Sequence, residues 1–153
     1  MPLFTRISAT DWLEEQKDEF PESWDVKQSI ELAKILAERG VDLLDVSSGG
    51  LHSKQQIKGG PGYQAPFAKE IKAAVGDELL VTAVGSITEG KLANELVNDG
   101  GLDGVFVGRF FQKNPGLVWQ WAEELGVEIQ SFNQVRWAFK GRAGKKIVHG
   151  PQR

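Results

Sequence analysis

The feature that most constrains this chain is a strand-like segment followed by a helix-like segment, repeated four times. The strand-like runs are short and apolar, and they lie at 3–8, 41–47, 79–84 and 104–107. Apolar residues at helical spacing follow each run, as at Val26, Ile30 and Ala33 after the first. Strands that alternate with helices predict a parallel sheet with helical crossovers. Two architectures remain open at this point, a doubly wound open sheet and part of a (β/α)₈ barrel.

Local signals predict where several of the helices begin and end. Asp25 and Gln28 have the spacing of a capping box, and Gly40 stands where a left-handed residue closes the same helix. Thr88 is expected to cap the third helix, and Asn114–Pro115 is expected to supply the N-cap and the first-turn proline of the fourth.

The length limits how much of a barrel this chain can form. A chain of 153 residues suits one domain, whereas a complete (β/α)₈ barrel needs roughly 250 residues. Four units would make half a barrel, with two unpaired strand edges and one uncovered apolar face, and both are unfavourable in water. A half-barrel must therefore associate or be a piece of something longer. We predict a half-barrel of four units over residues 1–126 and a basic tail over residues 127–153.

Composition excludes several classes of function. Hydrophobic residues make up 41% of the chain and charged residues 25%, which is typical of a soluble globular protein. No stretch approaches the roughly 20 apolar residues of a membrane span, and no signal-peptide pattern follows Met1, so a cytoplasmic protein is expected. The chain has no cysteine and only two histidines, which argues against a metal site. A net charge of -3 argues against a nucleic-acid partner.

Basic residues are concentrated at the C-terminal end. The last 18 residues hold six lysines and arginines and no acidic residue, and they are rich in glycine without an apolar stripe. This pattern predicts a mobile, solvated terminus, with phosphate, nucleic-acid or partner contacts as the alternatives.

Glycines follow the third and fourth strands, where the chemistry of parallel α/β folds gathers. Gly85 and Gly108 each come directly after a strand-like run, and Arg109 follows Gly108. Glycine lets an anion approach the backbone, and a guanidinium adds charge-assisted contacts. One such glycine alone is usually a turn residue, but two in consecutive units beside an arginine favour an anion site. Arg6, inside an apolar strand, either pairs with a surface carboxylate or serves the site.

Five segments then occur in one order and together carry a specific resemblance: Phe4–Trp12, Gly40–Gly50, Pro61–Gln64, Ala83–Thr88 and Val107–Arg109. Over about residues 3–126 the chain resembles the old yellow enzyme family, and it looks closest to the NADPH dehydrogenase and xenobiotic reductase branch. The resemblance implies a (β/α)₈ barrel that binds FMN without a covalent bond. It implies hydride transfer from NAD(P)H through the flavin to the β-carbon of an electron-poor alkene. This chain would correspond to strands five to eight, the C-terminal half.

The resemblance also implies roles for single residues. Arg6 would lie beside the pyrimidine side of the flavin, where a fixed cation stabilises the negative charge of the reduced ring. Gly85, Gly108 and Arg109 would hold the FMN phosphate. Arg136 is a looser match to the C-terminal arginine that reaches a neighbouring subunit's active site in some members, with a structural terminus as the alternative.

The family's substrate-binding pair, which is two histidines or a histidine and an asparagine, and its proton-donating tyrosine come from the N-terminal half, which has no counterpart here. No catalytic residue and no metal ligand is therefore assigned, and the isolated chain is expected to lack turnover. The expected function is the FMN-binding half of an NAD(P)H-dependent flavin oxidoreductase, an ene reductase whose complete form would take an enone-type acceptor. The alternative is a non-catalytic half-barrel that self-associates or docks on an N-terminal half.

Overall fold

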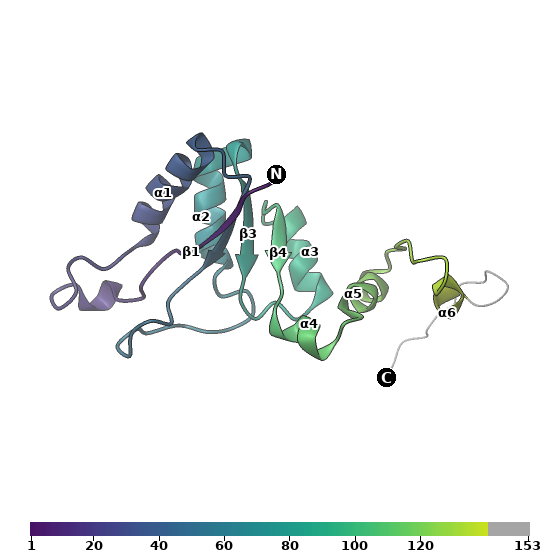
Figure 1. Ribbon diagram of the computed structural model, residues 1–153. Coiled ribbons are helices and arrows are strands. Elements are labelled where there is room, and N and C mark those ends of the chain that lie inside the picture. Colours follow the sequence, from purple (N-terminus) through teal and green to yellow (C-terminus); the bar gives the residue numbers. More distant parts are fainter. Residues whose placement is uncertain (141–153) are drawn as a thin grey trace.

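The computed structural model describes residues 1–140 and contains one parallel sheet of four strands (Figure 1). The strands stand in the order β1-β2-β3-β4, and their bounds are Phe4–Ser8, Leu43–Ser47, Leu80–Val84 and Gly104–Phe106. A doubly wound sheet reverses its strand order at a switch point, whereas barrel strands follow one another around the axis. The sequential order therefore decides between the two architectures in favour of a partial β/α barrel.

Helices connect and follow the strands in the predicted alternation. The α-helices are α1 (Val26–Glu38), α2 (Ala65–Val75), α3 (Gly90–Asn98), α4 (Arg109–Lys113), α5 (Leu117–Leu125) and α6 (Arg136–Lys140), and two 3₁₀ turns are η1 (Glu14–Gln16) and η2 (Gly76–Glu78). The capping box of α1 is confirmed, because Asp25 and Gln28 each bond the other's backbone N–H over 3.0 Å. Gly40 has a φ of 81°, as expected just beyond the end of α1.

The start of α3 differs from the prediction by one residue. Glu89, not Thr88, is the N-cap, and no side chain of this segment caps the helix. Instead, the N–H of Gly90 donates to Oε2 of Glu124 in α5 over 3.2 Å. A carboxylate from a neighbouring helix thus takes the place of the local cap, which a local sequence signal does not reveal.

The prediction that the last helix starts at Pro115 is also wrong. Residues 109–113 already form α4, which was not predicted, and the chain turns before α5 begins at Leu117. Asn114 Oδ1 accepts from the N–H of Gly116 over 3.0 Å, so Asn114 stabilises the turn and not a helix that starts at Pro115.

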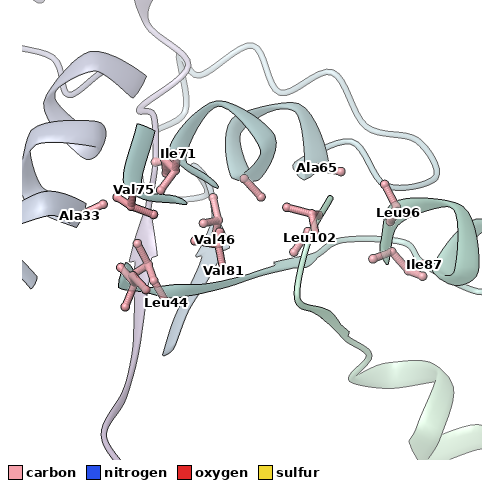
Figure 2. Close-up of a cluster of buried hydrophobic side chains, with 14 of the residues drawn as sticks. Ala33, Leu44, Val46, Ala65, Ile71, Val75, Val81, Ile87, Leu96 and Leu102 are labelled. Atoms are coloured by element: carbon pink, nitrogen blue, oxygen red, sulfur yellow. The ribbon is translucent and has the colours of Figure 1, made fainter. Parts of the chain in front are cut away.

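One face of the sheet is packed against helices. Outward-facing residues of β2 and β3 are fully buried, among them Leu44, Val46 and Val81. Figure 2 shows these side chains gathered beneath α2, which contributes Ile71 and Val75. Alternation along each strand sends every second side chain into this core.

The opposite face, called here the inner face, carries the remaining alternate residues. Phe4 is 59% exposed, Leu80 is 46% exposed and Phe106 is 36% exposed. In a barrel this face would look toward the other strands, so its exposure agrees with the uncovered apolar face predicted for half a barrel.

Residues 126–140 follow α5 and include the left-handed Gly126 and the short helix α6. The predicted division at residue 126 stays a prediction. Four of the six basic residues of the last 18, Arg142, Lys145, Lys146 and Arg153, lie outside the described residues. Within residues 1–140, no helix is both long enough and apolar enough to cross a membrane.

Candidate functional site

A groove of about 350 Å³ lies between the ends of β3 and β4. The predicted residues Gly85, Gly108 and Arg109 all line it, so the structure brings together three of the four proposed FMN contacts. Lys113 and the hydroxyl-bearing Ser86 line the same groove. Both glycine-tipped strand ends therefore open on one space, at the end of the sheet where parallel α/β folds bind ligands.

Gly85 has a backbone that a larger residue would strain. Its φ is 124°, and an added Cβ would lie 2.8 Å from Gln64 Nε2 and 2.8 Å from Tyr63 Cε1. The N–H of Gly62 also donates to the carbonyl of Gly85 over 2.9 Å. The loop after β2 is thus packed against the loop that lines the groove, and only glycine fits between them.

Gln64 is the residue that joins these loops, and the sequence interpretation missed it. Its side chain is buried, and its amide nitrogen donates to the carbonyl of Val84 over 2.7 Å. Its amide oxygen accepts from the hydroxyl of Ser48 over 2.7 Å, and that hydroxyl also accepts from Trp12 Nε1 over 2.9 Å. The network links the ends of three strands. A glutamine in a Gly-rich loop gives no sequence signal for such burial.

Gly108 differs from Gly85, because the protein itself does not require a glycine there. Its φ is -97°, and an added Cβ would meet nothing within 4 Å. The space beside this backbone is therefore open on the groove, as a close approach by a ligand would need.

Arg109 and Lys113 stand four residues apart on α4, which places both cations on one side of the helix. Lys113 was missed because α4 itself was not predicted, although the i, i+4 spacing is visible in the sequence. Two cations with neighbouring hydroxyls suit a doubly charged phosphate monoester, and no carboxylate is among the groove's described lining residues. The residues present therefore fit the phosphate of FMN.

Arg6 does not line the groove. It lies on the inner face, where its Nε forms an ion pair with Asp45, and its Cζ lies 5.7 Å from the ring centroid of Phe106. Phe106 does line the groove, so its side chain lies between the groove and Arg6 on the inner face. The partner of Arg6 is not the surface carboxylate considered from sequence, since the Asp45 side chain is only 4% exposed.

Arg136, the looser match, is exposed at the start of α6 and does not line the groove. Its role stays a prediction. Among residues 1–140 no three histidine, cysteine, aspartate or glutamate side chains gather as metal ligands would.

Comparison with known proteins identifies the family. A family model described as dihydrouridine synthase (Dus) matches residues 22–144. The chain belongs to the dihydrouridine synthase (Dus) family. Membership in this TIM-barrel family agrees with the four sequential parallel strands, and the fold is a partial (β/α)₈ barrel.

Individual relatives are oxidoreductases by name. The chain is 56% identical over 146 residues to an NADH:flavin oxidoreductase of Gibberella zeae, an alignment that covers 92% of the chain. It is 42% identical to an NADPH dehydrogenase of Geobacillus thermodenitrificans over 85% of the chain, and 37% identical to one of Bacillus subtilis over 84%. In each case the match spans only 35% of the relative's length.

Proposed function

We propose that this chain is the FMN-binding half of an NAD(P)H-dependent flavin oxidoreductase of the old yellow enzyme type. The observation that carries the proposal is the single groove on which Gly85, Gly108, Arg109 and Lys113 converge. The names of the relatives support a flavin and a nicotinamide donor. A cytoplasmic location is part of the proposal.

Each residue has a distinct task in the proposed complex. Arg109 and Lys113 neutralise the phosphate, and the backbone at Gly85 and Gly108 admits it closely. Arg6, on the inner face, holds the pyrimidine side of the ring. When bound, FMN supplies hydride transfer from NAD(P)H to an activated alkene such as an enone.

Turnover by this chain alone is not expected. The relatives are roughly two and a half times as long as this chain, since matches of 146 and 130 residues cover only 35% of them. No residue of the chain is assigned to bind the acceptor or to donate a proton, and positioning of the acceptor is a large part of the rate. We expect no steady-state reduction of an enone with NADPH. Ordinary enzymatic rates would show that the site is complete in this chain.

The test of the proposal is a titration of FMN followed by flavin fluorescence. Arg109→Ala removes a charged hydrogen bond worth about 1.5–3 kcal/mol, so FMN affinity should fall by roughly 10- to 150-fold. Riboflavin, which lacks the phosphate, should bind both proteins equally. Lys27→Ala, an exposed change on α1, is the matched control. Equal FMN binding by wild type and Arg109→Ala would overturn the phosphate site.

The exposed inner face favours a second candidate, a non-catalytic module that self-associates or docks on an N-terminal half. Phe4, Leu80 and Phe106 present apolar surface there, and such surface tends to be covered by a partner. Size-exclusion chromatography with light scattering tests self-association, because a stable monomer of 16.8 kDa contradicts it.

A further inference from the structure

Arg6, Asp45 and Thr82 form a row across three neighbouring strands on the inner face. Arg6 in β1 is in register with Asp45 in β2, and Asp45 is in register with Thr82 in β3. Parallel strands in this register place the three side chains next to one another on the same face. The Asp45 side chain is 4% exposed, whereas the Arg6 side chain is 54% exposed.

Both oxygens of the Asp45 carboxylate have partners, and the partners come from opposite sides. Oδ2 accepts from Arg6 Nε, and Oδ1 accepts from the hydroxyl of Thr82 over 2.9 Å. A buried carboxylate is tolerated when it is paired and hydrogen-bonded in this way. Because Thr82 holds the far oxygen, the carboxylate has a fixed orientation toward Arg6.

The contact at Nε decides which part of Arg6 stays free. A guanidinium has five N–H donors, and Nε carries only one of them. The other four are on the two outer nitrogens, and about half of the Arg6 side chain is exposed. The ring of Phe106, whose centroid lies 5.7 Å from Arg6 Cζ, adds a cation–π contact.

We propose that Asp45 is a positioning residue that holds Arg6 by Nε and leaves its outer N–H groups directed to a flavin ring on the inner face. The choice of ligand rests on the proposed function. The contact between Asp45 and Arg6 does not depend on the identity of the ligand, because both residues belong to this chain. Asp45 is not among the residues that line the groove, so its proposed effect is exerted through Arg6.

The first experiment measures the hold on Arg6 without any flavin. The Nε–H signal of Arg6 in the ¹⁵N-labelled chain is assigned by its absence in Arg6→Lys, and its exchange with solvent is measured by NMR. Asp45→Ala should speed this exchange by about ten-fold or more, since the charged hydrogen bond is lost. Asp45→Asn keeps an oxygen acceptor without the charge and should give an intermediate rate.

A control variant tests whether the change in Nε–H exchange is specific to Asp45. Glu31→Gln removes a carboxylate from an exposed ion pair on α1 and should leave the Arg6 signal unchanged. Should Asp45→Ala fail to fold, Asp45→Asn takes its place. Unchanged Nε–H exchange in a folded Asp45 variant overturns the proposal, whether or not the chain binds flavin.

The second experiment tests whether Asp45 acts through Arg6 on a flavin. Riboflavin affinity is measured for wild type, Asp45→Ala, Arg6→Ala and the double variant. Each single change should weaken binding by roughly ten-fold, and the double variant should bind no worse than Arg6→Ala. Additive losses would contradict a role through Arg6. Failure of wild type to bind FMN would instead refute the proposed function, while the exchange measurement would still decide the role of Asp45.

Discussion

The side-chain amide of Gln64 donates a 2.7 Å hydrogen bond to the carbonyl of Val84, the last residue of β3. The same amide accepts from Ser48, directly beyond β2. A buried side chain thus ties together two strand ends and supports the Gly85 loop that lines the groove. We expect removal of these two hydrogen bonds to lower both the stability of the chain and its affinity for a ligand in the groove.

Gln64→Leu keeps a similar volume but removes both hydrogen bonds. The Val84 carbonyl and the Ser48 hydroxyl lose a partner, so we expect a loss of about 1–3 kcal/mol in the free energy of unfolding. FMN affinity should fall as well, because the loop loses its support. Urea denaturation and FMN titration measure the two effects. Gln56→Leu, a change at an exposed position, should leave both unchanged.

The two groove glycines should respond differently to alanine. Gly85→Ala forces a Cβ into Gln64 and Tyr63 at a φ of 124°, so both stability and FMN affinity should fall, by about 1–3 kcal/mol in stability. Gly108→Ala has open space and an ordinary φ, so the melting temperature should stay within about 2 °C. FMN affinity should nevertheless drop, since the methyl group occupies the open space. Unimpaired FMN binding by Gly108→Ala would place the phosphate elsewhere.

Lys113→Ala should weaken FMN binding through lost charge. The ammonium group of Lys113 cannot make the paired hydrogen bonds to phosphate that the guanidinium of Arg109 can make. We therefore expect a smaller loss of FMN affinity, about three- to ten-fold. The salt dependence of FMN affinity should become shallower, because one cation is missing from the groove. Titrations at low and high salt measure both effects, with Lys27→Ala as the comparison. A loss that salt does not alter would contradict an electrostatic role.

Leu80→Lys should disrupt association through the inner face. Leu80 is 46% exposed there, so a lysine is tolerated by the folded chain but places a charge in any apolar contact. We expect light scattering to show a shift toward the monomer and urea denaturation at low concentration to show little change. Ile35→Lys, at an equally exposed site on α1, should not shift the assembly. An identical shift toward the monomer in both variants would show that the inner face is not the surface through which the chain associates.

Much of the framework could be predicted because its signals are local. The alternation that buries Leu44 and Val46 and the capping box of Asp25 and Gln28 each depend on neighbours within a few residues. The helix α4 was missed because five residues carry too little periodicity to identify a helix. The cap expected at Thr88 failed because Glu124, far along the chain, binds the N–H of Gly90 instead.

The sequence by itself determined four strand–helix units, the glycine-tipped strand ends and the two candidate cations Arg6 and Arg109. Only the tertiary structure decided which groups the side chains of these residues contact. Arg6 and Asp45 are 39 residues apart, and Gln64 and Val84 are 20 apart. Such pairs depend on the register between parallel strands and on how loops pack across strand ends. Register depends on how the buried faces of neighbouring strands pack together, and strands joined through a helix have no tight turn that fixes it locally.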